Sequence, residues 1–549
     1  MRKHLLVAGF LSMAFLAPSQ AATVATVNWT GASGSDWNTS SNWNTKPDST
    51  ATALFDTTLS SVTNSSGTDQ SVSSISFDTS AGTAGGTFTI GSTGGNKLIL
   101  TNAGTTQILS ILDGTGKTIT INAPVTLSPA SGNTAGAYTF FNNSADSSNT
   151  LNFGGAISGG TTTGTVTLTL GGANTGNNTI SGLISNGSAS GGVFVFKTGE
   201  GTWILGADNT FTGRLDIRGG TLKLGSNQTT ARELKMGDTT SNTAVTFDLA
   251  GYSFSTTTSV VSSLSPQTTG AAGATMSIID SSGGKTGMLI LGNNILYNAG
   301  TADNNNGQVT ISANIDLNSA LRRITVADSD QTTTEVVISG NISSETGSIS
   351  KEGAGTLVLG GTNTYTGNTT VRAGTLLING STASSSAVNV SSGATLGGNG
   401  TAAGAVSISG TLAPGNSIGS LNTGDLTLSS TGILGIELGR SGGTPVSDRT
   451  NVTGTVTLVS GANLNLTLYT GLTNPVTNDI FFLVINDGLD AITGQFAKLN
   501  GSAQTLSEGS KFNWNGQVWK ITYRANFEGT PSFTEGNDLA IQVVPEPAS

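Results

Sequence analysis

The chain has 549 residues, 77 of them glycine, with 10% charged residues, 35% apolar residues and a formal net charge of −10 at pH 7. An average globular chain is about a quarter charged and about 7% glycine, and a disordered chain pairs low hydrophobicity with high net charge. The sequence has no cysteine, which excludes disulfides and thiolate sites, and its acidic balance argues against nucleic-acid binding. Because the chain is too long for one compact core, its composition predicts an extended, glycine-rich β structure.

Residues 1–21 have the pattern of a secretory signal peptide: two basic residues, an apolar run over 5–16, and small residues before Ala21. We expect cleavage after Ala21, with Ala22 as the alternative. A membrane anchor is the other interpretation, but the run is shorter than the ~20 residues that span a bilayer. Beyond it no apolar run is long enough for a spanning helix. Since the only histidine is His4, the mature chain has no residues for Ser-His-Asp triads or the usual zinc ligand sets.

The first region of the mature chain, residues 22–150, contains Trp29, Trp37 and Trp43 among Gly, Asn and Ser. These tryptophans could form a platform on which sugars stack. They could also cover the open end of a repeat structure, where core would otherwise be exposed. We favour the second interpretation and predict an N-terminal β cap.

An internal repeat follows. The segments Lys197–Gly225 and Lys351–Asn379 are identical at 14 of 29 aligned positions. The second copy predicts three short strands, Thr356–Leu359, a strand that begins with Thr369–Val371, and Thr375–Ile378, with Gly and Asn turns between them. Such strands bury a face only when they are stacked, here as coils of roughly 20 residues, which is the principle of a β-solenoid. At about 4.8 Å per stacked strand, the body would reach on the order of 80 to 100 Å.

The two copies define a first repeat region, residues 151–230, and a second, residues 346–430. Between them, residues 231–345 contain strand-like runs but no match to the repeat. The sequence therefore leaves open whether this intervening β segment continues the solenoid or interrupts it.

The stretch from Lys351 to Leu376, which begins Lys-Glu-Gly-Ala-Gly-Thr-Leu, resembles the autotransporter-associated β-strand repeat of bacterial passenger-type proteins. The turn at Gly410–Gly419 resembles the turn that follows such repeats, and the stretch from Asp448 to Val543, within a C-terminal β region of residues 431–544, resembles their closing β region. The resemblance implies an all-β, right-handed parallel β-helix (a β-solenoid) with N- and C-terminal β caps. It also implies a secreted bacterial surface or matrix protein, structural or adhesin-like, without catalysis or a cofactor. Its partners would be extracellular polysaccharide or other cell-surface components.

The last residues, 545–549, contain Pro545, Glu546 and Pro547, which resemble the start of a PEP-CTERM sorting signal. That signal serves export by an exosortase-type transpeptidase and normally continues into an apolar helix and a cluster of arginines, whereas the sequence stops at Ser549. The resemblance implies exosortase-type machinery as a partner if the C-terminus is completed. The alternative is a proline-rich end that arose by chance.

Parallel β-helices also carry polysaccharide-degrading enzymes, which need two carboxylates about 5 to 10 Å apart. The candidates are Glu200, Asp208 and Asp216, all within the first repeat copy and without acidic counterparts in the second. We favour solvated turn acids over a catalytic pair. A polysaccharide-binding or polysaccharide-degrading protein stays open as the alternative function.

Calcium is the metal that the oxygen-rich turns would suit. The candidate turns are Asp303–Gly307, Asp328–Asp330 and Gly397–Ala402, where Ala402 stands in place of the Asp of a calcium-binding nonapeptide. None has the spacing of an EF-hand loop, so we favour ordinary Asx turns and expect no metal site.

Overall fold

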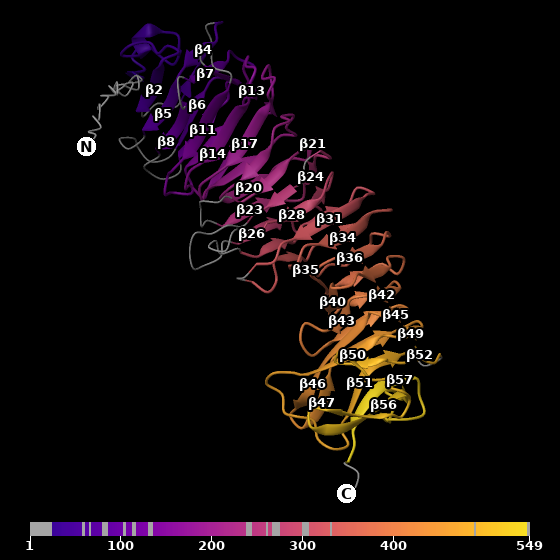
Figure 1. Cartoon of the computed structure of the whole chain (residues 1–549). Helices are drawn as coiled ribbons and strands as arrows, with labels where there is room; N and C mark the ends of the chain where they lie inside the picture. Colours follow the sequence, from indigo (N-terminus) through magenta and orange to yellow (C-terminus); the bar gives the residue numbers. More distant parts are fainter. Residues whose placement is uncertain are drawn as a thin grey trace, which may run out of the picture.

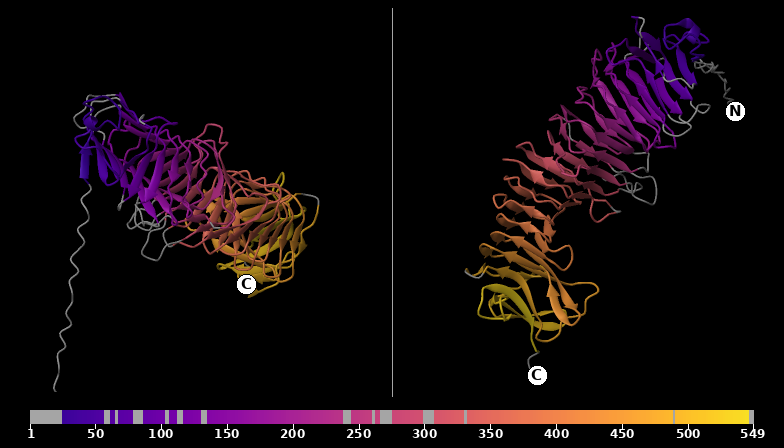
Figure 2. Two further views of the ribbon diagram at one scale, coloured as in Figure 1. Left: turned by 90° about the horizontal axis from the view of Figure 1, so that it is seen from above. Right: turned by 180° about the vertical axis from the view of Figure 1, so that it is seen from behind.

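The computed structural model describes residues 25–56, 61–64, 67–78, 86–102, 106–111, 117–129, 135–237, 244–259, 262–265, 275–298, 307–329, 332–487 and 490–545. Figure 1 shows an elongated, curved stack of strands with the N-terminal coils (indigo) and the C-terminal coils (yellow) at opposite ends. The views in Figure 2 show the same stack from above and from behind. A single 3-10 turn, η1 (Ser40–Asn42), interrupts the β structure of the described residues, and none of their helices is long and apolar enough to cross a bilayer.

Each coil of the chain contributes one strand to a continuous parallel sheet, which we call the first face. Its strands are β1 (Ala25–Asn28), β2 (Ala51–Asp56), β5 (Ser74–Asp78), β8 (Thr106–Ile111), β11 (Gly136–Asn142), β14 (Val166–Gly171), β17 (Val193–Lys197), β19 (Leu215–Ile217), β22 (Leu234–Met236), β25 (Ser262–Leu264), β28 (Ile295–Tyr297), β31 (Leu321–Val326), β34 (Ser348–Glu352), β36 (Thr369–Val371), β39 (Val388–Val390), β42 (Val406–Ile408), β45 (Leu426–Leu428), β49 (Val456–Leu458) and β52 (Thr493–Gly494). The 19 strands of this sheet correspond to a stack of about 85 Å at about 4.8 Å per step, within the expected range.

A second face runs beside the first along the stack. Its parallel strands are β3 (Ser61–Val62), β6 (Gly86–Ile90), β9 (Lys117–Ile121), β12 (Thr150–Phe153), β15 (Asn177–Ile180), β18 (Thr202–Leu205), β20 (Gly220–Leu224), β23 (Val245–Asp248), β26 (Met276–Ile279), β29 (Val309–Ile311), β32 (Val336–Ile338), β35 (Thr356–Leu359), β37 (Thr375–Ile378), β40 (Thr395–Gly398), β43 (Thr411–Pro414), β46 (Ile433–Ser441), β50 (Asn463–Leu468) and β53 (Lys498–Leu499). Two antiparallel strands are added to it, β47 (Thr444–Ser447) on β46 and β54 (Ser502–Ala503) on β53.

The third face consists of three separate sheets. The first contains β4 (Gln70–Val72), β7 (Leu98–Asn102), β10 (Val125–Pro129), β13 (Ile157–Gly159) and β16 (Ile184–Ser185). The second contains β21 (Gln228–Arg232), β24 (Ser253–Thr256), β27 (Met288–Ile290), β30 (Asn314–Asp316) and β33 (Ile342–Ser343). The third contains β38 (Ser381–Thr382), β41 (Thr401–Ala402), β44 (Ser420–Thr423), β48 (Arg449–Val452) and β51 (Ile480–Asn486), and then the antiparallel strands β57 (Asp538–Val543), β56 (Gln517–Ala525) and β55 (Lys511–Trp514).

The core lies between the faces because alternate residues of each strand point inward. A ladder of leucines shows this most clearly: Leu357, Leu376, Leu396, Leu412, Leu434, Leu464 and Leu499 are register partners from one second-face strand to the next, and all are buried. Full burial of one leucine side chain stabilises a fold by about 1.5 to 3 kcal/mol before the entropy cost of ordering it. The repeated ladder therefore holds successive coils in register.

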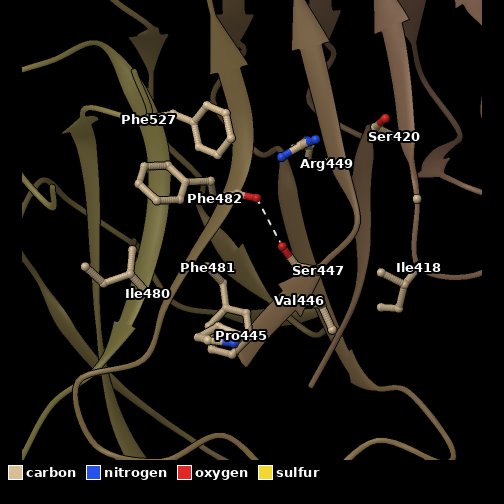
Figure 3. Close-up of a pocket in the computed structure, with 11 residues that line it drawn as sticks. Ile418, Ser420, Pro445, Val446, Ser447, Arg449, Ile480, Phe481, Phe482 and Phe527 are labelled. Carbon is tan, nitrogen blue, oxygen red and sulfur yellow. Dashed lines mark hydrogen bonds between the residues drawn. The ribbon is translucent and has the colours of Figure 1, made fainter. Parts of the chain in front are cut away.

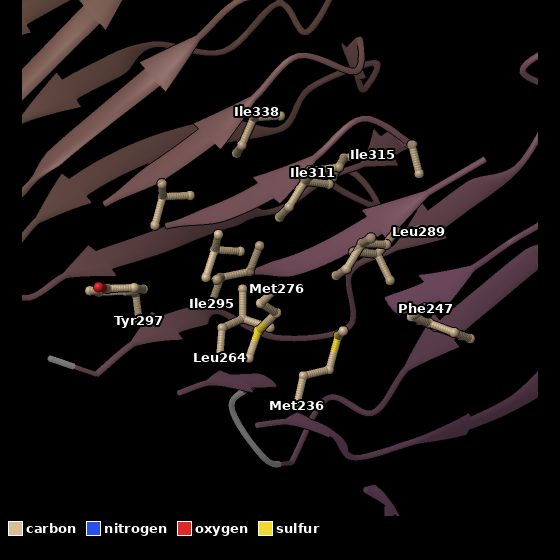
Figure 4. Close-up of a cluster of buried hydrophobic side chains, with 14 of the residues drawn as sticks. Met236, Phe247, Leu264, Met276, Leu289, Ile295, Tyr297, Ile311, Ile315 and Ile338 are labelled. Carbon is tan, nitrogen blue, oxygen red and sulfur yellow. The ribbon is translucent and has the colours of Figure 1, made fainter. Parts of the chain in front are cut away.

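The prediction of an all-β parallel solenoid is confirmed, and the three strands predicted for the second repeat copy coincide with β35, β36 and β37. The structure also answers the open question about residues 231–345. The described strands of residues 231–345 continue the first and second faces. They also form most of the middle one of the three sheets on the third face. Figure 4 shows their shared core, in which Met236, Phe247, Ile295 and Ile338 point into one cluster.

The third face is interrupted at the two repeat copies. Throughout residues 193–217 and 348–371, every one of which the structure describes, the chain passes from the second face to the first without a third-face strand. Lys197 consequently pairs with Ile217, and Lys351 with Val371, only 20 residues further along the chain. Each repeat copy is therefore a short coil that separates one third-face sheet from the next.

Candidate functional site

The three acids of the first repeat copy lie on different sides of the coil. Glu200 is exposed in the turn between the first and second faces. Asp208 lies in the loop that replaces the third-face strand, where it accepts hydrogen bonds from Thr229 N at 2.8 Å and Thr229 Oγ1 at 2.6 Å. Asp216 belongs to β19 on the first face. The structure does not bring them together as the carboxylate pair that glycoside hydrolysis requires.

Asp216 is not the solvated turn acid that the sequence led us to favour. Its side chain is fully buried, because Arg214 and Arg218 cover it with nitrogen–oxygen distances of 3.1 Å and 2.9 Å. Both guanidinium groups also stack over the Phe196 ring, with centroid distances of 5.5 Å and 4.4 Å. Arg-x-Asp-x-Arg places all three side chains on one face of a strand, since the strand repeats every two residues. This spacing was the signal that sequence reasoning missed.

Two of the three oxygen-rich turns lie partly outside the described residues. Residues 303–306 and Asp330 lie outside the described residues, and Gly397–Ala402 forms the end of β40 and the start of β41. Among the residues that the structure describes, no three His, Cys, Asp or Glu side chains are grouped as metal ligands would be.

Trp29, Trp37 and Trp43 form one buried aromatic cluster on the first coil. Trp43 packs edge-on against Trp29 and Trp37 at centroid distances of 4.8 Å and 4.9 Å, and its Nε1 donates to Trp37 O at 2.8 Å. Phe55 of β2 contacts all three indoles, at 5.5 to 5.9 Å. Their exposed fractions are 4% or less, so they offer no open surface on which a sugar could stack. This packing supports the predicted N-terminal cap, which stays a prediction.

We expect Trp37→Ala to lower the free energy of unfolding of the first coils by about 3 to 5 kcal/mol, the usual cost of truncating a fully buried large aromatic residue. Hydrogen exchange of the β1, β2 and β5 amides would measure the loss. Tyr252→Ala is the matched control, because Tyr252 is 37% exposed. Equal exchange in the two variants would contradict a stabilising role for the cluster.

Each repeat copy buries a lysine that the sequence analysis did not single out. Lys197 follows Val193 and Val195 on the inward side of β17, and it is fully buried. Its Nζ donates to three backbone carbonyl oxygens, those of Thr198 at 2.9 Å, Gly199 at 2.8 Å and Gly219 at 2.8 Å. Removal from water lowers the pKa of Lys197 to about 7. The ammonium group joins the turn of its own coil to the turn of the next.

Lys351 repeats this arrangement in the second copy. Its Nζ donates to the carbonyl oxygens of Glu352 at 3.2 Å, Gly353 at 2.8 Å and Ala373 at 3.0 Å. Burial lowers the pKa of Lys351 to about 8, and the negative charge of Glu335 partly opposes that effect. The first of these turns requires glycine, since Gly353 has a φ of +77° and a Cβ there would press on the carbonyl of Val326.

A buried asparagine replaces the missing third-face strand. The side-chain oxygen of Asn363 accepts a hydrogen bond from Ile342 N at 3.0 Å. Ile342 belongs to β33, the edge strand of the third-face sheet on the N-terminal side. The Nδ2 of Asn363 donates to Gly361 O at 3.2 Å and to Ser381 O at 3.0 Å. Ser381 belongs to β38, the edge strand of the third-face sheet on the C-terminal side. The amide side chain therefore adds hydrogen bonds at the edges of two sheets, beside the backbone bonds from Asn363 N to Ser381 O and from Thr364 N to Ile342 O, both 2.8 Å.

The first copy uses its asparagine in the same way. Asn209 accepts from Ile184 N of β16 at 2.7 Å and donates to Gln228 Oε1 of β21 at 3.1 Å. Arg232 fills the space beside it, with its guanidinium 4.0 Å from the Phe211 ring centroid and 2.7 Å from Asn209 O. The repeat motif thus encodes a junction between third-face sheets.

The turn at Gly410–Gly419 is held by a buried acid from a different coil. Asp448, which is 2% exposed, accepts hydrogen bonds from Gly419 N at 3.0 Å and from Glu437 N at 2.8 Å. Burial raises the pKa of Asp448 to about 7. The hydrogen bonds from the two N–H donors lower the pKa, and the negative charge of Glu437 raises it further.

The pKa of Asp448 predicts that acid stabilises this region. The folded state binds a proton that the unfolded state releases near pH 4, so stability falls as the pH rises from about 4 to about 7. The expected contribution is on the order of 3 to 4 kcal/mol. Hydrogen exchange of β46 and β48 at pH 5 and pH 7.5 would measure it. Asp448→Asn should flatten the profile, whereas Asp425→Asn, in an exposed turn, should leave it; an unchanged slope in Asp448→Asn would contradict this origin.

The predicted processing and sorting residues fall mostly outside the described residues. Ala21 and Ala22 are not among them, nor are Glu546 and Pro547, while Pro545 is exposed after β57. The cleavage site and the sorting signal therefore stay predictions.

Residues 195–224 and 349–378 match the passenger-associated-transport-repeat family. These are the two short coils with a buried lysine and a buried asparagine. The chain is also 42% identical over 80 residues, 15% of its length, to the adhesin BmaC autotransporter of Brucella suis biovar 1, and the match covers 2% of that protein. The chain thus contains passenger-type repeats, and it spans only a small part of the adhesin that it matches.

Proposed function

We propose that the chain is a secreted, structural and adhesin-like protein of the bacterial cell surface or extracellular matrix. The observation that carries this is the uninterrupted first face, which runs through both passenger-type repeats and makes one elongated body. An elongated stack of repeats offers a long, continuous surface for binding. The likeness to an autotransporter adhesin supports the same role.

Beads coated with the full chain would test adhesion directly. We expect them to attach to surfaces that carry extracellular polysaccharide or bacterial envelope components, and to do so more than beads coated with an unrelated β-solenoid of equal charge. Equal attachment of the two bead types would contradict the proposal.

We further propose that the protein has no catalytic activity, since the acids of the first repeat copy lie on separate sides of the coil. A reducing-sugar assay over a panel of glycans tests this. Turnover that is lost in Glu200→Gln or Asp208→Asn would instead establish the polysaccharide-degrading alternative.

Export by a signal peptide cut after Ala21, and sorting through Pro545, Glu546 and Pro547, complete the proposal. N-terminal sequencing of the exported product tests the cut. A product that begins elsewhere than after Ala21 or Ala22 would contradict it.

A further inference from the structure

A groove of about 320 Å³ lies on the third face near the C-terminal end of the stack. It runs between β48, β51 and the hairpin β46–β47 (Figure 3). Its walls are half-buried and expose polar and apolar surface in equal parts, with Ile480 and Phe482 of β51 and Val446 of the hairpin among the apolar residues. Binding sites for small ligands commonly begin at about 300 Å³ and combine apolar walls with a few polar groups.

Two phenylalanine rings form the aromatic part of the groove. Along β51 the side chains alternate, so that Phe481 packs into the core 5.8 Å from the Trp519 ring while Phe482 faces outward. Phe482 meets Phe527 in a T-shaped contact at 5.1 Å between centroids. Figure 3 shows the two rings next to each other among the residues that line the groove.

A cation stands beside these rings without an acidic partner among the described residues. The guanidinium carbon of Arg449 lies 5.0 Å from the Phe527 ring centroid, and no described carboxylate forms an ion pair with it. Three neighbouring acids are engaged elsewhere: Asp448 and Asp538 each accept from two backbone N–H groups, and Asp479 pairs with Arg440 at 3.1 Å. Glu528, which follows Phe527, is exposed and forms no ion pair with Arg449. The charge of Arg449 is therefore available to a ligand.

These groups define the chemistry of the ligand. The negative face of an aromatic ring attracts the weakly positive C–H face of a sugar ring. A guanidinium group binds a carboxylate through two parallel hydrogen bonds. Because the chain carries a net charge of −10, an anionic ligand would be held by a local cation and not by overall attraction.

We propose that this groove binds a uronic-acid residue of an acidic polysaccharide, with Arg449 pairing with its carboxylate and the rings of Phe482 and Phe527 contacting the sugar. The proposal deepens the surface function proposed above and rests on it, because it names a partner for the exposed body.

Titration calorimetry of the full chain with short uronate oligosaccharides, of galacturonate, mannuronate and glucuronate type, would test the groove. Each oligosaccharide is compared with its methyl-esterified form, which keeps the ring and removes the carboxylate charge. We expect at least one uronate series to bind, and esterification or Arg449→Gln to weaken that binding by about tenfold or more.

Phe527→Ala should weaken binding of both the acid and the ester form. Arg449→Lys should retain part of the affinity, which shows that loss in Arg449→Gln is not misfolding.

Phe533→Ala is the matched control, because Phe533 also pairs with a cation, Lys520 at 5.6 Å, but lies outside the groove. We expect it to bind like the parent chain. Equal affinity of Arg449→Gln and the parent would overturn the proposal, as would equal binding of acid and ester forms. If no uronate binds while coated beads still adhere, the groove proposal fails and the surface function stands.

Discussion

Replacing Lys351 with methionine is expected to lower the free energy of unfolding of the second repeat region by about 1 to 3 kcal/mol. Methionine has a similar length and is apolar, so the core stays filled while three partly buried backbone carbonyls lose their donor. An unpaired buried polar group costs about 1 to 3 kcal/mol. Denaturant unfolding, together with hydrogen exchange of β34 to β37, would measure the loss and locate it.

Lys197→Met provides an independent repeat of this experiment. Because Lys197 and Lys351 lie in separate coils with no shared partner, their effects should add in the double variant. Lys235→Met is the control, since Lys235 lies half-exposed on the outer side of β22. A change below about 1 kcal/mol in both repeat lysines would show that the carbonyl contacts do not stabilise the junction.

The strands of the repeat could be predicted because their pattern is local. Short β-rich runs bounded by Gly and Asn give β35, β36 and β37 at their observed limits. The buried lysines were missed, although the alternation Val193, Val195, Lys197 places the lysine on the inward row of its strand. Lysine is rarely buried without a partner, and its partners here are carbonyls of turns that have no side-chain signature.

Features that depend on the pairing of one coil with the next were not predictable in the same way. Val388 pairs with Val406, 18 residues on, whereas Thr457 pairs with Thr493, 36 residues on. The loops between strands absorb this variation, so the sequence alone does not fix which residues stack. The groove illustrates the consequence, because Arg449, Phe482 and Phe527 meet only after two coils and an antiparallel extension are in place.

The two asparagines explain why the repeat motif is useful to a long solenoid. A third-face sheet that ends leaves N–H and C=O groups unpaired, which is costly in the interior and invites pairing with other chains at the surface. The amide of Asn363 bonds backbone groups at both sheet edges, whereas that of Asn209 bonds the backbone N–H of Ile184 at one edge and the side chain of Gln228 at the other. A motif of this kind lets a third-face sheet end and another begin while the first and second faces continue.

Asn363→Asp is therefore expected to destabilise the junction by about 2 to 4 kcal/mol at pH 8. The new side chain has the same shape, but its carboxylate would face the carbonyl oxygens of Gly361 and Ser381 in a buried site. Burial and these oxygens would raise its pKa, so that the folded state binds a proton more tightly than the unfolded state. Stability should then recover as the pH falls to about 4, because the protonated acid again donates a hydrogen bond.

Asn341→Asp separates this effect from the charge change alone. Asn341 is exposed, and its Oδ1 accepts a hydrogen bond from Thr362 N at 2.8 Å, a role that a carboxylate oxygen fills equally well. Hydrogen exchange of β33 and β38 should therefore accelerate at pH 8 in Asn363→Asp and stay unchanged in Asn341→Asp. If Asn363→Asp accelerates exchange equally at pH 4 and pH 8, the damage is steric and the amide does not act as the donor between sheets. If neither variant changes the exchange of β33 and β38, the edges of the two sheets are stable without the amide of Asn363, and this asparagine does not stabilise the junction.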